Sequence, residues 1–107
     1  MTTPFEDLAA LDKLVHEPAR LAILTALEAA HEVDFLFLQS ITGLTKGNLS
    51  THLSKLEEAE FVNSKKHFQG KKPVTSIALT DKGRRAIQQH WQQLETLRQQ
   101  AWVWKTT

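Results

Sequence analysis

The hydrophobic period of this chain changes near residue 60. Upstream, Leu49, Leu53 and Leu56 recur at spacings of four and three, a pattern typical of a helix that buries one narrow stripe. Downstream, Phe61-Val62 begins an extended segment, residues 69–73 form a predicted turn, and residues 74–79 alternate as a return strand. The sequence therefore predicts a mostly polar helix followed directly by a β-hairpin.

Apolar periodicity predicts four other helices. The first covers residues 5–15, the second begins at Pro18, the third ends at Thr42 after a strand residue or two near Phe35, and the last covers residues 81–104. The last helix carries an apolar stripe and is both long and amphipathic.

Local signals place the ends of these helices. Pro18 is tolerated in a first helical turn because its missing N–H would be unpaired there. Gly43 can end the third helix in a left-handed conformation, and Thr45 can cap the central helix. Thr80-Asp81 offers a similar cap for the last helix.

Size and composition indicate one compact domain over residues 1–107, of which 41% are hydrophobic. No apolar run approaches the roughly 18 residues that cross a bilayer, and no basic segment followed by an apolar run begins the chain, so we expect a cytoplasmic protein. The absence of cysteine excludes disulfide frameworks, thiolate nucleophiles and iron–sulfur sites.

Charge is unevenly distributed although the formal net charge is only +1. Residues 1–45 carry a net charge of −5 and the remainder carries +6. Residues 61–80 contain no acid, and four lysines cluster there: Lys65, Lys66, Lys71 and Lys72. This asymmetry indicates that one part of the molecule meets a polyanion. The alternative is a lysine-rich hairpin whose charged side chains are simply solvated.

Two signatures carry a family resemblance. Residues 50–59, Ser-Thr-His-Leu-Ser-Lys-Leu-Glu-Glu-Ala, resemble the Ser-x-His-Leu-x-x-Leu-Glu-x-Ala-Gly recognition helix of ArsR- and MarR-type winged helix-turn-helix regulators. Residues 42–45 resemble the preceding turn, and residues 79–83, Leu-Thr-Asp-Lys-Gly, resemble the Leu-Thr-x-x-Gly that follows the wing. Residues 11–20 are similar to the Leu-Asp-x-x-x-His-x-x-x-Arg segment with which the first helix of the small stand-alone winged-helix DNA-binding proteins often begins.

The resemblance implies a mainly α fold with a small β-hairpin wing (α+β), in which a long C-terminal helix follows the wing. It places the helix-turn-helix at about residues 35–59, the wing at about 61–79, and dimerisation helices at about 5–15 and 81–104. It also implies a transcriptional regulator that binds double-stranded operator DNA as a homodimer, without a cofactor. Two positions depart from the pattern: Glu60 replaces a glycine, which predicts a less sharply turned helix end, and Gln39 replaces a small alanine.

The central helix supplies the candidate DNA contacts. Lys46, Asn48 and Thr51 lie near its N-terminal end and away from the leucine stripe, so we expect them to approach bases. Gly47 would let the backbone come close to DNA.

Phosphate contacts are expected from hydroxyls and cations elsewhere on this helix and on the wing. The candidates are Thr45, Ser50, His52, Lys55, Lys65, Lys66, Lys71 and Lys72. For Ser50 and His52, intrahelical bonding or contact with the third helix is the alternative.

The terminal helices carry more apolar surface than a small domain readily covers, which indicates a dimer interface. The candidates are Leu8, Leu11, Trp91, Leu94, Leu97 and Trp104. The alternative is that these side chains simply close the core.

Other function classes have weaker support. The five histidines are scattered, and no glycine-rich phosphate loop or activated nucleophile can be assembled, so we expect no enzyme. His90 and Glu95 fall on different helix faces, so we expect no metal site. The main competitor is a winged helix that binds or dimerises with protein instead of DNA.

Overall fold

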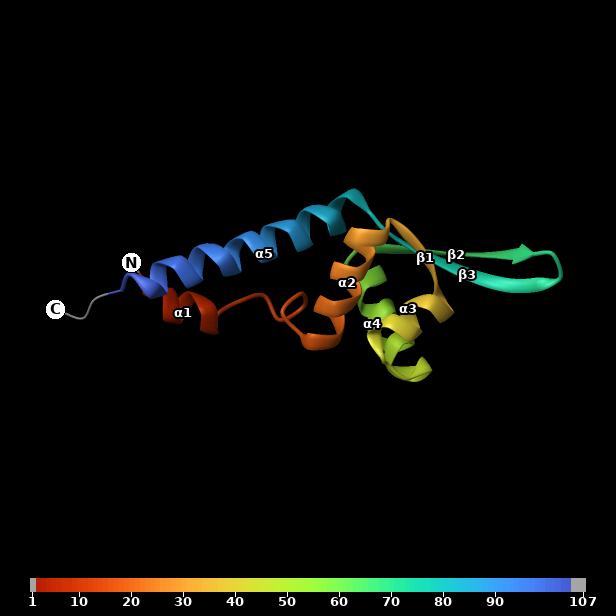
Figure 1. Cartoon of the computed structure of the whole chain (residues 1–107), viewed down its shortest axis with the longest axis horizontal. Coiled ribbons are helices and arrows are strands. Elements are labelled where there is room, and N and C mark those ends of the chain that lie inside the picture. Colours follow the sequence, from red (N-terminus) through yellow and green to blue (C-terminus); the bar gives the residue numbers. More distant parts are fainter. Residues whose placement is uncertain (1, 105–107) are drawn as a thin grey trace.

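The computed structural model describes residues 2–104 as helices packed around a small antiparallel sheet (Figure 1). In chain order the elements are α1 (Pro4–Ala9), α2 (Pro18–Ala30), β1 (Glu32–Asp34), α3 (Phe35–Thr42), α4 (Lys46–Glu58), β2 (Val62–Gln69), β3 (Lys72–Leu79) and α5 (Asp81–Trp102). The predicted α+β winged helix-turn-helix with a long last helix is confirmed. None of the helices in the described range is long and apolar enough to cross a membrane.

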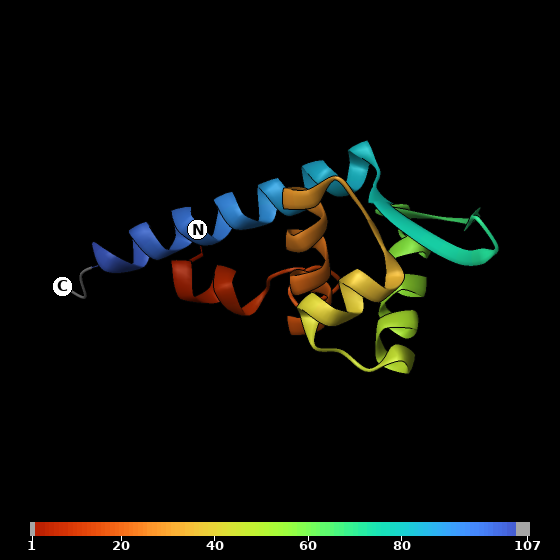
Figure 2. The same cartoon turned by 45° about the vertical axis from the view of Figure 1, so that its right-hand side comes forward.

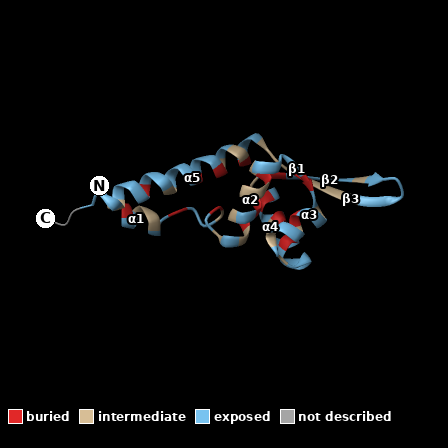
Figure 3. Ribbon diagram, viewed as in Figure 1, coloured by how far each residue is buried: buried red, intermediate tan, exposed pale blue. Residues whose placement is uncertain are grey.

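The core lies where α2, α3 and α4 meet the sheet and the first turns of α5 (Figure 3). Its fully buried side chains include Leu24, Leu38, Leu49, Leu56 and Ile77. The leucine stripe of α4 thus faces inward, as its spacing predicts, and the rest of that helix is left toward solvent.

The sheet has the order β1-β3-β2, with both pairs antiparallel. β1 pairs only with Ser76–Ala78, so most of the β2–β3 hairpin has no third strand. The hairpin closes through a two-residue turn in which Gly70 has a φ of 64°. Because so little packs against it, the hairpin projects from the core as a wing (Figures 1 and 2).

Four predicted helix boundaries are confirmed, at Pro18, Gly43, Thr45 and Thr80. Pro18 occupies the first turn of α2, and Gly43 ends α3 with a φ of 71°. The Thr45 hydroxyl accepts a hydrogen bond from the Asn48 N–H at 3.1 Å, and the Thr80 hydroxyl accepts one from the Gly83 N–H at 2.9 Å. Each bond satisfies an otherwise unpaired donor in a first helical turn.

The first helix is shorter than predicted. α1 ends at Ala9, and residues 10–17 form an irregular connection, not the helix expected over residues 5–15. The Asp12 carboxylate accepts a hydrogen bond from the Leu14 N–H at 2.9 Å, which offers the backbone an alternative to helical bonding. The apolar residues Leu11 and Val15 are buried nonetheless. Their spacing therefore indicated buried positions but did not indicate a helix.

The end of α4 also differs from the expectation. Glu60 adopts a left-handed φ of 63°, so the sharp turn is kept without a glycine. The Phe61 N–H donates to the Leu56 carbonyl at 2.9 Å and the Glu60 N–H to the Glu57 carbonyl at 2.9 Å, which is the Schellman pattern of a helix C-terminus.

The residues of the Leu-Thr-x-x-Gly signature join this turn to α5. The Thr80 hydroxyl donates to the Glu60 carbonyl at 2.6 Å, in addition to its capping role. A Cβ atom at Gly83 would lie 2.0 Å from the Phe61 carbonyl oxygen, so only glycine fits this approach of two backbones.

The molecule is elongated, with principal extents of 67 × 25 × 21 Å. The wing projects at one end, and α5 with α1 packed along it extends at the other (Figures 1 and 2). We call this second projection, residues 4–11 and 90–104, the arm.

Candidate nucleic-acid interface

The outer face of α4 is exposed along its length. Because Leu49 and Leu53 anchor the opposite side in the core, the helix cannot rotate to hide its polar residues. The exposed set contains Lys46, Gly47, Asn48, Ser50, Thr51 and Lys55. Nothing lies within 4 Å of a Cβ built at Gly47, so the backbone there is open to an approaching surface.

A groove with a volume of about 740 Å³ separates α4 from the wing. It brings together four of the predicted contact residues, namely Lys46, Ser50, Lys66 and Lys72. Asp34 and Glu57 also line it, so the groove is not uniformly basic.

The wing lysines point in different directions. In the register of β2 and β3, Lys66 lies opposite Thr75 on the face that lines the groove, whereas Lys65 lies opposite Ser76 on the other face. Lys71 occupies the exposed turn. Of the adjacent pair, only Lys66 therefore faces the groove.

Two predicted hydroxyl contacts are already engaged with the backbone. Thr51 Oγ1 donates to the Gly47 carbonyl at 2.9 Å, and Thr45 Oγ1 accepts from the Asn48 N–H. Both residues remain exposed and keep free lone pairs, so each hydroxyl can still accept a hydrogen bond.

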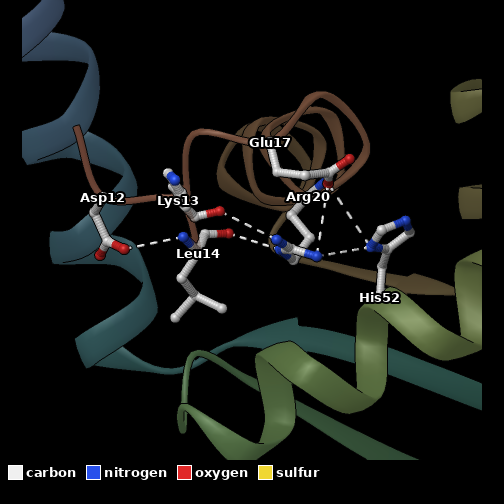
Figure 4. A network of polar contacts seen from close by, with 6 residues as sticks. All are labelled: Asp12, Lys13, Leu14, Glu17, Arg20 and His52. Atoms are coloured by element: carbon white, nitrogen blue, oxygen red, sulfur yellow. Dashed lines mark hydrogen bonds and ion pairs between the residues drawn. The ribbon is translucent and has the colours of Figure 1, made fainter. Parts of the chain in front are cut away.

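His52 is half-buried and turned toward the start of α2 (Figure 4). Its Nδ1 lies 3.0 Å from a guanidinium nitrogen of Arg20 and 3.7 Å from a carboxylate oxygen of Glu17. Because an arginine can only donate, the neutral ring accepts at Nδ1 and carries its hydrogen on Nε2. His52 contacts α2, whereas the sequence alternative placed it against the third helix.

Arg20 is the centre of this network, a role that its place at the end of the segment 11–20 did not predict. Its side chain is buried and donates to the carbonyls of Leu14 at 2.7 Å and Lys13 at 3.1 Å. It therefore joins the irregular connection after α1 to α4 (Figure 4).

Glu17 completes the network. Burial raises the pKa of its carboxyl, but the backbone N–H groups of Arg20 and Ala19, the charge of His52 when its ring is protonated, and the charge of Arg20 outweigh that effect, so the pKa lies below its ordinary value. The carboxylate is thus held ionised beside Arg20, 3.8 Å away.

The arm presents only part of the predicted dimer interface. Leu11 and Leu97 are buried within one chain, so these two predicted interface residues instead pack inside the arm. Leu8 and Leu94 are partly buried, whereas Trp91 and Trp104 are exposed.

Three large apolar side chains that the sequence reasoning did not single out are also exposed on the arm: Phe5, Trp102 and Val103. Phe5 and Trp104 pack edge to face with ring centroids 6.0 Å apart. The Trp91 indole N–H donates to Thr25 of α2 at 3.1 Å, so this tryptophan also ties the arm to the core.

A histidine pair joins the arm to the connection after α1. His16 Nδ1 and His90 Nε2 lie 3.0 Å apart, and His90 is buried. Burial lowers the pKa of His90, the nearby His16 lowers it further, and Asp12 opposes them. Within residues 2–104 no three histidine or carboxylate side chains are grouped to hold a metal ion.

Comparison with known sequences gives one family match and one informative relative. A family model described as a winged helix DNA-binding domain matches residues 19–97. An uncharacterized protein of Methanocaldococcus jannaschii is 37% identical over 78 residues, which cover 73% of this chain and 85% of the relative.

Solved structures share the same fold. A transcriptional regulator homologue from Pyrococcus horikoshii OT3 superposes with a TM-score of 0.81 at 24% identity, covering 90% of this chain and 94% of that one. A MarR-family transcriptional regulator from Silicibacter pomeroyi superposes with a TM-score of 0.67 at 17% identity, covering 96% of this chain and 66% of that one. The predicted resemblance is therefore confirmed at the level of fold.

Proposed function

The chain belongs to the winged helix DNA-binding domain family, and on this premise we propose that it is a transcriptional regulator that binds specific double-stranded DNA as a homodimer in the cytoplasm. It performs no catalysis in this proposal. The groove between the exposed face of α4 and the basic wing is the observation that carries it.

In the proposed complex α4 enters the major groove, which is wide enough to admit a helix. Lys46 and Asn48 reach base edges, where lysine favours guanine and asparagine pairs with adenine. Thr51 has already donated its hydroxyl hydrogen to Gly47, so it contributes an acceptor and a methyl group. Gly47 lets the helix backbone approach the DNA without obstruction.

Phosphates bind around this centre. Thr45, Ser50 and Lys55 contact the backbone on either side of the major groove, and His52 donates from Nε2 while Arg20 holds Nδ1. The wing lies along the duplex or in the neighbouring minor groove, where its lysines bind phosphates: Lys65, Lys66, Lys71 and Lys72. Each neutralised phosphate steepens the salt dependence of log K by about 0.9.

The arm supplies the dimer. Leu8, Leu94, Trp91 and Trp104 contribute partly or fully exposed apolar surface, and Phe5 and Trp102 extend it. Two copies would present recognition helices roughly 34 Å apart, one helical turn of DNA. One helix alone buries too little surface for tight specific binding.

A salt titration of DNA binding tests the proposal. We expect retardation of duplexes selected from a random pool, with an affinity that falls steeply as salt increases because the wing and α4 displace counterions. Lys71→Ala combined with Lys72→Ala should weaken binding to all duplexes by similar factors, whereas Asn48→Ala should relax preference at one base pair. No retardation, or a slope near zero, would contradict the proposal.

One observation favours a second candidate, a module that binds protein. α3 leaves three large apolar side chains exposed, Leu36, Phe37 and Ile41. Binding through that patch would be insensitive to salt, because it buries apolar surface and releases few ions. The same titration therefore separates the two candidates.

A further inference from the structure

Phe68 is an unusual residue for the wing. It is 72% exposed, near the end of β2, in a segment that carries four lysines and no acid. Single exposed apolar residues are common and need no special reason. The position of Phe68 on the hairpin, however, indicates a specific role for its exposed ring.

Phe68 lies on the same face of the hairpin as Lys66. Side chains two apart on a strand share a face, so Phe68 follows Lys66 on this side. Their partners across the hairpin are Pro73 and Thr75. Lys66, Pro73 and Thr75 line the groove, whereas the ring of Phe68 lies outside its lining and is exposed beside it near the wing tip.

The hairpin is long enough to carry this ring to the next groove of a duplex. Phe68 follows Val62 by six positions, which corresponds to about 20 Å along an extended strand. A minor groove lies roughly half a helical turn, about 17 Å, from the adjacent major groove. With α4 in the major groove, Phe68 reaches the minor groove beside it.

We propose that Phe68 is an apolar wedge that enters this minor groove, partly unstacks one base step and bends the duplex toward the major groove. The inference rests on the proposed function and adds a source of specificity that needs no hydrogen bond to a base. Lys71 and Lys72 hold the flanking phosphates while the ring is inserted. Unstacking costs least at flexible pyrimidine–purine steps, so the protein prefers TA or CA under the wing tip.

The probe is a duplex recovered by selection with the wild-type protein and labelled with a fluorophore at each end. Wild-type protein is expected to shorten the end-to-end distance, and Phe68→Ala to bend the duplex less and bind about tenfold more weakly. Phe68→Leu keeps an apolar wedge and should retain most of the bend. Replacing the step under the wing by a stiff A-tract should remove the advantage of wild type over Phe68→Ala.

Phe37→Ala is the matched control, because Phe37 is an exposed phenylalanine on α3 and outside the wing. It should leave both the bend and the preference for the flexible step unchanged. Thermal unfolding of each variant by circular dichroism reports whether it folds.

The outcomes distinguish failure of the proposed function from failure of the Phe68 wedge. If wild-type protein retards no duplex, the proposed function fails and the wedge fails with it. If wild type and Phe68→Ala bind and bend the selected duplex equally, only the wedge is overturned. The exposed ring of Phe68 would then be available to contact another protein.

Discussion

At position 60 the chain uses a left-handed turn without the residue that adopts it most easily. Glu60 has a φ of 63° in the Schellman turn that ends α4, where a side chain with a Cβ is strained. We expect Glu60→Gly to raise the free energy of unfolding by about 1 kcal/mol, since glycine removes that strain. Denaturant unfolding monitored by circular dichroism measures the change.

Glu60→Ala is the control for the charge. It removes the carboxylate that lies 3.9 Å from the Lys82 ammonium but keeps the Cβ, so it should not stabilise the protein. The pair is exposed on both sides and is worth little. Equal stabilisation by both variants would mean that the carboxylate, and not the backbone, is the source of the cost.

A second residue-scale effect concerns the pair of His16 and His90. Burial and the nearby His16 hold the pKa of His90 below its ordinary value, so the folded protein keeps this ring neutral. As the pH falls through about 6.5, the unfolded chain takes up a proton that folded His90 does not. The unfolded state is favoured, so this contribution to stability is present above that pH and lost below it.

The measurement is the free energy of unfolding at neutral and mildly acidic pH. His90→Gln removes the titration, and its amide can still form a hydrogen bond with His16. We expect a shallower loss of stability on acidification in the variant than in the wild type. Identical slopes would show that His90 does not contribute.

At the scale of elements, α4 contains a glycine that lowers the stability of the helix but lies on the face proposed to bind DNA. Gly47 is exposed in the first turns of a helix, with nothing within 4 Å of a built Cβ. We expect Gly47→Ala to stabilise the fold by about 0.5–1 kcal/mol through helix propensity. It should nevertheless weaken DNA binding, because the added methyl holds the backbone away from the duplex.

Ser54→Ala is a change on the same helix, at a residue that lines the groove but follows the proposed base contacts. It should alter DNA affinity less than Gly47→Ala does. Unchanged or tighter DNA binding by Gly47→Ala, in gel retardation, would contradict the docking of α4.

Much of the fold at this scale was predictable from local sequence signals. Thr45 and Thr80 are caps, Gly43 is a helix end, and the leucine spacing of α4 sets which face is buried. Each of these depends on residues within a few positions of one another. The exposure of the α4 residues that are proposed to contact DNA was predictable for the same reason.

The remaining features depend on contacts between distant segments. Arg20 ends the segment that resembles the small winged-helix proteins, but the pattern does not show that it is buried against the carbonyls of Lys13 and Leu14 and contacts His52 from across the fold. The early end of α1 depends on the Asp12 side chain, which competes with helical bonding. Apolar spacing alone could not separate Leu97, which is buried, from the exposed tryptophans of the arm.

At the scale of the whole molecule, the wing and the arm lie at opposite ends of a 67 Å long axis (Figure 1). The surface proposed to bind DNA and the surface proposed to bind a second copy are therefore separate. Changes at the end of the arm should alter assembly without touching the groove that is proposed to bind DNA.

Trp102 offers the cleanest test of this separation, because it is 88% exposed and a substitution removes little intrachain packing. We expect Trp102→Gln to weaken the dimer at least 30-fold if the indole is a central anchor, which corresponds to about 2 kcal/mol. Sedimentation over a range of concentrations measures this constant. Ile41→Gln, an exposed apolar change on α3, is the control and should leave it unaltered.

The same variant links assembly to DNA binding. A monomer engages one half-site and contacts about half as many phosphates, so the slope of log K against log salt should fall to about half the wild-type value. A variant that stays dimeric would show that Trp102 is not an anchor of the dimer, and one that becomes monomeric and keeps the full slope and affinity would show that the arm does not join two DNA-binding units. The steep salt dependence of wild type would then have to come from a single wing and a single recognition helix.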